Sequence, residues 1–451
     1  MEFILRFLKK IIPQPIFKFL QPAYHWLLGF LAALFYGFPS RKLTVIGVTG
    51  TKGKTTTCNL IAQILNSAGF KTGMTTTVNF RIGSREWINT GKQTMLGRFR
   101  LQKLLAEMVG AGCHYAVVET SSEGILQYRH RFIDYKIAVF TNLTPEHIER
   151  HGGFENYRDA KLKLFKQVAK KPNAIGIYNL DDKNVGYFLK PKINRQYVYT
   201  LQLPDSRTKI NNLHIVSNIK SSAKGTNFLF SACARGGCAS GGDKEKFEMP
   251  LIGEMNVYNA AAAICVAISQ GIPRRQIKKA LAKAVPPPGR LELVNAGQKF
   301  TVIIDYSYEP ASLENALKTI KVFKPKRIIL VVGSAGGGRD KWRRPVMGEL
   351  ADKYANLIVI TTDDPYDENP ETITKEILAG VLKNKKRILG KNVFKITDRR
   401  LAIKKAIGLA KKGDVVLLAG KGGEMWMNVA GNKKIPWDEK KIAEEIIKAK
   451  S

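Results

Sequence analysis

VIGVTGTKGKTTT, residues 45–57, joins a β-branched run to a glycine-rich turn and the polar start of a helix. Glycines let backbone N–H groups converge on a phosphate, and the first turn of the following helix adds a partial positive charge. A lysine here can bridge two phosphate groups, and a threonine hydroxyl can complete a magnesium shell. The stretch therefore predicts a nucleotide-binding phosphate loop made by Gly50, Thr51, Lys52, Gly53, Lys54, Thr55 and Thr56.

Short apolar runs alternate with longer amphipathic segments on the carboxyl side of this loop. HYAVVET (114–120) and KIAVFTNL (136–143) are predicted buried strands with polar ends, where the ligands of a parallel sheet collect. Residues 196–250 carry shorter alternating runs that favour antiparallel hairpins, and NVYNAAAAICVAISQG (256–271) predicts a tightly packed helix. We expect a central P-loop domain over residues 43–288, with a mostly parallel sheet and a small β insertion.

A proline-rich junction, PPPGR at 286–290, ends this pattern, because consecutive prolines cannot continue a helix. The strand–helix alternation then restarts, with predicted strands in FTVIIDY (300–306), RIILVV (327–332), NLIVI (356–360) and DVVLLA (414–419). We therefore predict a second, Rossmann-like α/β domain over residues 289–451, which makes the fold class α/β throughout.

Residues 1–42 form a separate apolar segment, in which no Asp, Glu, Lys or Arg occurs between Phe19 and Ser40. That length suits a bilayer-spanning helix. Pro22 and His25 shorten its apolar part, however, which favours an interfacial or docked helix. Peripheral membrane attachment, a helix packed on the protein itself and a true span stay open, in that order of preference.

The formal net charge of +36 attracts polyanions, but the lysines are dispersed over the whole length without a dense basic run. A nucleic-acid-binding ATPase would need basic residues interleaved with aromatics along one groove, and the sequence has no such stripe. We therefore expect no nucleic-acid partner. The five cysteines lack zinc-site spacing, which predicts reduced thiols in a cytosolic compartment.

The loop segment GVTGTKGKTTT resembles the nucleotide loop of the Mur ligase family, with Lys52 where the family usually has Asn. Ten further segments resemble the family in the same order, and together they span roughly residues 43–430. The pattern is most similar to the MurE type, which adds the third residue to UDP-N-acetylmuramoyl-L-Ala-D-Glu. The segments are VETSSEGI, FTNLTPEHIERHGGFENYRDAKLKLF, YNLDD, GEMNVYNAAAA, PPGRLE, IDYSYEPASL, GSAGGGRDKWRRPVMGELA, TTDDPYDENPETI, TDRRLAI and AGKGGE.

The resemblance implies a ligase that activates a carboxylate as an acyl phosphate at the expense of ATP. Its catalytic residues would be Lys54, Glu119, His147 and Lys161, the last as a carbamate able to ligate a metal. Magnesium would be held by Thr55, Glu119, His147 and carbamylated Lys161. The loop would share ATP binding with Asn142, Asn256, Asn259, Arg290 and Asp305. His151 is assigned no catalytic role.

By the same resemblance, the incoming amino acid would be surrounded by Arg339, Asp363, Asp364, Tyr366, Gly420 and Glu424, and the acceptor would contact Thr94, Ser121 and Ser122. The meso-diaminopimelate enzymes usually carry Asp-Asn-Pro-Arg where this chain has DDPY. Tyr366 therefore replaces an arginine that would clamp a distal carboxylate. The extra acid, Asp364, favours a substrate with a distal amine, such as lysine. Alternatively, Arg339, Arg343 or Arg344 could bind a distal carboxylate in place of the missing arginine.

Several acceptor-side positions depart from the family. Glu123 replaces a histidine, Tyr308 and Glu309 replace His and Thr, and GKGHE becomes GKGGE. The family's usual UDP-binding first domain is expected to be absent, with the apolar segment 1–42 in its place. The ATP apparatus is thus the firmer part of the resemblance, and recognition of UDP stays open.

We expect an ADP-forming acid–amino-acid ligase of peptidoglycan precursor synthesis that uses ATP and Mg²⁺. Its substrates would be UDP-N-acetylmuramoyl-L-Ala-D-Glu and a diamino acid. It would be a cytoplasmic monomer that contacts the inner face of the membrane through residues 1–42. One alternative is a Mur-like ligase for another carboxylate acceptor, such as a poly-amino-acid, folate-type or lipid-linked one. Another is a non-ligating ATP-binding membrane tether, which Glu119, His147 and Lys161 disfavour because nucleotide binding alone needs none of them.

Overall fold

A computed structural model describes residues 14–91, 93–145, 151–202, 212–233, 244–338 and 340–450. The chain divides into two units. The first consists of Met1–Lys220, Asn227–Met249 and Met255–Ala284, and the second of Ser221–Thr226, Pro250–Glu254 and Val285–Ser451.

The strand that leads into the glycine loop, β1 (Thr44–Thr49), lies inside a sheet of eleven described strands, in the order β11-β10-β9-β8-β7-β6-β1-β5-β2-β3-β4. The pairs from β2 through β5, β1, β6, β7 and β8 to β9 are parallel. The other strands are β2 (Thr72–Thr75), β3 (Asn79–Ile82), β4 (Arg85–Ile88), β5 (Tyr115–Glu119), β6 (Tyr135–Phe140), β7 (Ile175–Asn179), β8 (Arg195–Thr200), β9 (Leu213–Ser222), β10 (Gly225–Cys233) and β11 (Lys244–Met249).

Helices pack on this sheet and fix the position of the loop. One core cluster joins Leu105 of α4 (Arg98–Gly110) and Leu164 of α7 (Phe154–Val168) to Val45, Ala116 and other strand residues. Helix α3 (Lys54–Ser67) contacts β1, β2 and β5. Helix α10 (Arg274–Ala282) packs against α3 and contacts β11. The remaining helices of this unit are α5 (Ser122–Leu126), α8 (Val185–Leu189) and α9 (Glu254–Ser269).

The parallel part of the sheet extends further than the sequence pattern predicts, so the expectation of hairpins from residue 196 onward is wrong at its start. β8 pairs parallel with β7, and β9 pairs parallel with β8. The last four residues of β8, Tyr197–Thr200, are all buried. Burial on both faces is what parallel strands require, and it removes the alternation on which a hairpin prediction depends.

The second unit holds a six-stranded sheet in the order β12-β13-β17-β14-β15-β16, parallel except for the β12–β13 pair. Its strands are β12 (Glu292–Val294), β13 (Thr301–Asp305), β14 (Ile328–Val332), β15 (Leu357–Ile360), β16 (Val393–Lys395) and β17 (Val415–Ala419), with a separate pair β18 (Trp426–Val429) and β19 (Lys433–Pro436). Its helices are α11 (Pro310–Thr319), η2 (Ile320–Phe323), α12 (Arg343–Tyr354), α13 (Pro370–Leu382), α14 (Arg399–Leu409) and α15 (Glu439–Lys450). All four strands predicted in this region are present, and the predicted α/β class is confirmed.

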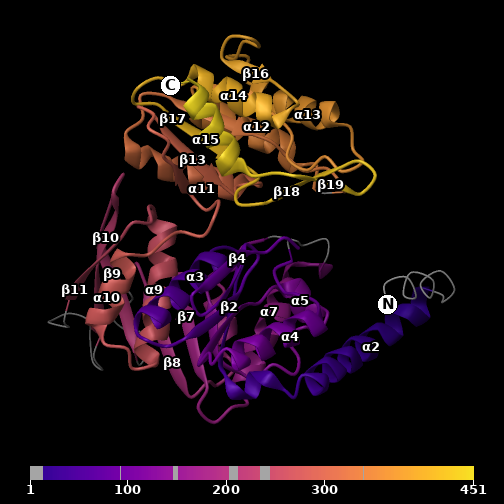
Figure 1. The fold of residues 1–451 in the computed structure, drawn as a ribbon, viewed down its shortest axis with the longest axis vertical. Coiled ribbons are helices and arrows are strands. Elements are labelled where there is room, and N and C mark those ends of the chain that lie inside the picture. Colours follow the sequence, from indigo (N-terminus) through magenta and orange to yellow (C-terminus); the bar gives the residue numbers. More distant parts are fainter. Residues whose placement is uncertain are drawn as a thin grey trace. The chain divides into compact units, whose positions relative to one another are not determined.

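The apolar N-terminal segment contains one long helix, α2 (Gln14–Phe35), followed by η1 (Pro39–Lys42). It lies against α4 of the first unit (Figure 1). Within the described residues, no helix has the length and apolar character needed to cross a membrane.

Candidate functional site

The glycine loop sits between the carboxyl end of β1 and the first turn of α3, where backbone N–H groups point outward. Gly50 has φ +152°, and a Cβ there would lie 2.0 Å from the Thr141 hydroxyl. Gly53 has φ +78°, and a Cβ would lie 2.2 Å from Asn259 Oδ1. Both positions therefore require glycine. Lys54 folds back over the loop, and its Nζ donates to the carbonyl of Thr51 at 3.0 Å.

Glu119, at the carboxyl end of β5, is the hydrogen-bonding centre of the site. Its side chain is buried, and Oε2 accepts from the Thr55 hydroxyl at 2.9 Å and from the Thr77 amide at 2.8 Å. Oε1 accepts from the Thr77 hydroxyl at 3.0 Å. The carboxylate is thus held beside the first turn of α3, where a phosphate-bound cation would need an anionic oxygen ligand.

Lys161 lies in the interior beside the loop, in a chain that contains 73 lysine and arginine residues. It is 2% exposed, and its Nζ donates to the Gly50 carbonyl at 2.8 Å. The Tyr157 ring lies one turn earlier on α7, with its centroid 4.4 Å from the ammonium. Lys161 is therefore a buried residue of α7 and not part of its solvated face.

Asn142, which follows β6, fixes the loop backbone. Its Oδ1 accepts from the Lys52 amide at 2.8 Å, and its Nδ2 donates to the Lys52 carbonyl at 3.1 Å. Asn259 donates to Asn256 Oδ1 at 3.1 Å and accepts from the Thr57 hydroxyl at 3.2 Å. Asn259 thus lies next to the glycine loop and Asn256 beside Asn259, while their adenine-side role stays a prediction.

Of the three predicted acceptor-side residues, Thr94 is linked to Glu119 through the hydroxyl of Thr77. The Thr77 hydroxyl, which also donates to Glu119, lies 2.9 Å from the Thr94 hydroxyl. Ser121 is the N-cap of α5, where its hydroxyl accepts from the Gly124 amide at 3.1 Å. Ser122 is buried in the first turn of the same helix. Ser121 therefore has a structural role in addition to any contact with an acceptor.

Two predicted ATP-side residues lie together in the second unit. The Arg290 guanidinium is 4.5 Å from the centroid of the Tyr306 ring, and Asp305 Oδ2 accepts from the Leu291 amide at 2.8 Å. Burial raises the pKa of the Asp305 carboxyl above its ordinary value, and the nearby Arg290 charge opposes that rise.

Asp363 follows β15 and belongs to a fully buried ionic cluster. Its Oδ1 accepts from Arg399 Nη1 at 2.5 Å, and Arg399 is also paired with Glu439 at 2.5 Å. Burial raises the pKa of Asp363 to about 6, despite the opposing charges of Arg399 and Lys421. Asp363 Oδ2 has no partner among the described residues, and a Cβ on Gly420 would lie 2.5 Å from it.

A second cluster lies beside it around Lys421, which is 1% exposed. Lys421 Nζ donates to Asp364 Oδ1 at 2.8 Å and to Glu424 Oε2 at 2.7 Å. Burial alone would lower the pKa of Lys421, but the carboxylates of Glu424 and Asp364 raise it above its ordinary value. Asp364, expected to favour a distal amine of the substrate, therefore already has an internal ammonium as its partner. Tyr366 adopts a left-handed backbone with φ +53°.

Two predicted residues, His147 and Arg339, lie outside the residues that the structure describes. In the described ranges no group of three or more His, Cys, Asp or Glu side chains could hold a metal ion. Of the remaining predicted magnesium ligands in the first unit, Thr55 and Glu119 provide a hydroxyl and one carboxylate, and Lys161 would provide an oxygen only as a carbamate. That set fits a cation that takes its other ligands from phosphate oxygens and water.

The sequence-based site omitted three residues. Thr77 donates twice to Glu119 but lies in a threonine run without a motif, so no local signal marked it. Arg399 and Lys421 lie inside segments that resemble the family, TDRRLAI and AGKGGE, so their place in these segments was a signal available in the sequence. Their burial beside Asp363 and Asp364 is visible only in the structure.

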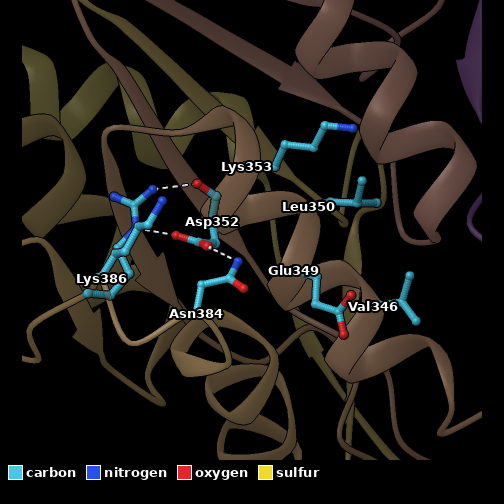
Figure 2. Close-up of a pocket in the computed structure, with 8 residues that line it drawn as sticks. Val346, Glu349, Leu350, Asp352, Lys353, Asn384 and Lys386 are labelled. Carbon is cyan, nitrogen blue, oxygen red and sulfur yellow. Dashed lines mark hydrogen bonds and ion pairs between the residues drawn. The ribbon is translucent and has the colours of Figure 1, made fainter.

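A pocket of about 700 Å³ lies on α12, and none of the candidate site residues lines it (Figure 2). Its lining residues hold the end of this helix in place. Arg387 donates to the carbonyls of Asp352 at 2.5 Å, Ala355 at 2.8 Å and Asn356 at 3.1 Å. Asn384 donates to the Asp352 carboxylate at 2.9 Å. These bonds satisfy the carboxyl-terminal carbonyls of the helix, so the pocket needs no ligand to explain its polar lining.

Comparison with known proteins gives the same family for both units. The profile of the Mur ligase middle domain matches residues 48–267, and that of the Mur ligase, glutamate ligase domain matches residues 289–422. The UDP-N-acetylmuramoyl-L-alanyl-D-glutamate–2,6-diaminopimelate ligase of Geobacillus kaustophilus (strain HTA426) is 37% identical over 427 residues, which cover 93% of this chain and 82% of that protein. The UDP-N-acetylmuramyl-tripeptide synthetase of Roseiflexus sp. (strain RS-1) is 37% identical over 422 residues, covering 91% and 79%.

Solved structures agree in fold. A UDP-N-acetylmuramoyl-L-alanyl-D-glutamate–2,6-diaminopimelate ligase is 29% identical, with a TM-score of 0.62 over 90% of this chain and 78% of that one. The MurF ligase from Thermotoga maritima in complex with ADP is 18% identical, with a TM-score of 0.63 over 94% and 83%. With relatives above one third identity over most of both chains, and with matches to the middle and glutamate ligase domains, the chain belongs to the Mur ligase family.

Proposed function

We propose that this ATP-dependent ligase joins a diamino acid to the D-Glu carboxylate of UDP-N-acetylmuramoyl-L-Ala-D-Glu. The observation that carries the proposal is the set of Lys54, Glu119 and buried Lys161 around one phosphate loop. Nucleotide binding alone does not need a buried carboxylate and a buried lysine at the loop, whereas phosphoryl transfer to a second anion does. Relatives over 93% of the chain carry the corresponding name.

A carboxylate is a poor acylating agent, so it must first be activated. Transfer of the γ-phosphoryl group of ATP to the carboxylate gives an acyl phosphate and ADP. The amine then attacks the carbonyl carbon, the C–N bond forms, phosphate leaves and the amine loses a proton. Lys54 and the N–H groups at the start of α3 would neutralise the charge that brings two anions together.

Magnesium would be held by Thr55 and Glu119, with His147 and a carbamate on Lys161 as further ligands. The ion would supply positive charge between the phosphate and carboxylate oxygens. Carbamylation suits Lys161 because its buried amine, in neutral form, would add CO₂ and lose a proton, which would give an anionic oxygen donor beside the loop.

The amino acid would be bound at the carboxyl ends of β15 and β17. The Asp363–Arg399–Glu439 and Asp364–Lys421–Glu424 groups contain four carboxylates and two cations. A second amine on the substrate would add a cation beside these carboxylates, which supports a diamino acid. Because Lys421 already pairs with Asp364, this support comes from the whole cluster and not from Asp364 alone.

We further propose that the enzyme acts as a cytoplasmic monomer, in the compartment that supplies both ATP and a nucleotide-linked acceptor.

The test is phosphate release from ATP with UDP-N-acetylmuramoyl-L-Ala-D-Glu and, in turn, lysine, meso-diaminopimelate or ornithine, with the product mass measured. We expect release that depends on both the acceptor and one diamine. Lys54→Gln should abolish it, whereas Lys279→Gln, an exposed lysine of α10, should not. Absence of product with every amino acid, from protein that still binds ATP, would refute the proposed acceptor.

A further inference from the structure

Helix α2 has two apolar faces, and the inner one is covered by the protein. Ala32 and Ala33 are fully buried, and a Cβ on Gly29 would lie 3.3 Å from the Phe132 ring. The rings of Trp26 and Phe30 contact the same phenylalanine edge-on, with centroids 5.3 and 5.6 Å away. These contacts hold α2 in a fixed orientation on the first unit.

The outer face of α2 is apolar and has no cover in the described structure. Leu20, Leu27, Leu31 and Leu34 recur at i, i+7, i+11 and i+14, which places them along one stripe, and all four are exposed. Leu27 is 50% exposed, and Phe35, at the end of the stripe, is 75% exposed. We call these five residues the outer stripe. Isolated exposed leucines are ordinary in proteins, but a continuous stripe of this kind marks an interaction surface.

Positive charge borders the carboxyl-terminal end of the outer stripe. Arg41 and Lys42 are exposed in η1, directly after α2. Phe35 approaches Phe99 of α4, with ring centroids 6.4 Å apart, and exposed Arg100 follows it. Residues 1–42 as a whole contain six Lys or Arg residues and a single acid, Glu2. The apolar stripe is therefore accompanied by cations and almost no anions.

From this combination we infer that the outer stripe docks on the surface of an anionic lipid bilayer, with α2 lying in the plane of the interface. Leucine and phenylalanine side chains enter the boundary between head groups and acyl chains, while neighbouring cations contact lipid phosphates. A second copy of the chain fits this surface less well, because two positively charged borders would face each other. The inference goes beyond the ligase reaction, which uses other residues of the chain.

The test is sedimentation of the full chain with vesicles of phosphatidylcholine containing 30% phosphatidylglycerol, and with pure phosphatidylcholine vesicles. We expect stronger binding to the anionic vesicles and a loss of about tenfold or more in the Leu27→Glu/Leu31→Glu variant. The matched control is Ile388→Glu/Leu389→Glu, which removes two exposed apolar side chains elsewhere and should bind like the wild type. Far-ultraviolet circular dichroism and thermal unfolding verify that each variant folds.

A second variant, Arg41→Gln/Lys42→Gln/Arg100→Gln, leaves the apolar stripe unchanged and should lose the preference for anionic vesicles. No sedimentation of the wild type with anionic vesicles would overturn the inference. So would equal binding by Leu27→Glu/Leu31→Glu. A dimer in sedimentation velocity that this variant dissociates, without vesicle binding by the wild type, would assign the outer stripe to a second copy instead. Because phosphate release is measured without vesicles, failure here is distinct from failure of the proposed reaction.

Discussion

Buried charged side chains mark the candidate functional residues of each unit. Glu119 and Lys161 are each 2% exposed in the first unit, and Asp363, Arg399 and Lys421 are buried in the second. Burying a charge costs free energy unless partners compensate it. Five buried charges are therefore poorly explained by a contribution to folding stability alone. Each of these charges also lies at the carboxyl end of a parallel strand or beside the phosphate loop, which is where a ligand would meet it.

Glu119→Gln tests the carboxylate without changing its shape. The amide oxygen can accept from Thr55 and from the Thr77 amide, and the NH₂ group can donate to the Thr77 hydroxyl, so the fold should persist. Loss of the negative charge should reduce kcat at least about 100-fold and weaken the magnesium dependence of phosphate release. The exposed Glu107→Gln is the control. Unchanged kcat in Glu119→Gln would remove Glu119 from the metal site.

Asp363 should give the stability of the protein a pH dependence. Its folded-state pKa of about 6 lies above the ordinary value of 3.8, so the folded protein holds this proton more tightly than the unfolded chain does. The stabilisation is complete below about pH 4 and is lost as the pH rises through 6, with a change of up to about 3 kcal/mol.

Urea unfolding of the wild type and Asp363→Asn at pH 4.5 and 7.0 measures this effect, because the asparagine cannot titrate. The free energy of unfolding of the wild type, relative to the variant, should be lower at pH 7.0. A difference that stays constant between the two pH values would show that Asp363 titrates normally.

At the scale of elements, apolar runs predicted the strands well, because burial of a continuous run depends only on local composition. β13, β14, β15 and β17 all lie within their predicted segments. The pairing partners were harder to predict, as the parallel β8–β9 pair illustrates. Thr77 could not be found at all, because its position beside Glu119 results from sheet order and not from any nearby residue. Domain boundaries at 43–288 and 289–451 stay predictions.

Helix α12 offers a prediction that separates stability from catalysis. Arg387 satisfies the carbonyls of Asp352, Ala355 and Asn356 at the end of this helix. Arg387→Gln should lower the free energy of unfolding by about 1–3 kcal/mol, because those groups lose a charged donor. Thermal unfolding and kcat should be measured together, with the exposed neighbour Lys386→Gln as control. A normal melting temperature with reduced kcat would instead make the α12 pocket part of the functional site.

At the scale of the whole molecule, the net charge of +36 creates a field that acts on every ligand. The lysine and arginine residues that produce this field are dispersed along the sequence and do not form one binding site. Together they attract anions, over a distance that becomes shorter as the salt concentration rises. ATP and a UDP-linked carboxylate are multiply charged anions, whereas the amino acid is a zwitterion or a cation. The field should therefore distinguish among the three substrates of the proposed reaction.

Raising NaCl from 20 to 300 mM should lower kcat/KM for ATP and for the acceptor several-fold, because screening shortens the Debye length to below about 10 Å. For the amino acid, the same change should alter kcat/KM less than about twofold, since its net charge is small or of the same sign as the protein. Steady-state kinetics with each substrate varied in turn measures all three, and the amino acid is the internal control. A parallel fall for all three substrates would mean that salt weakens the folded enzyme or its metal binding and not the encounter with anions. A fall for only one of the two anions would show that local charges at its binding site, and not the field of the whole molecule, control its encounter with the enzyme.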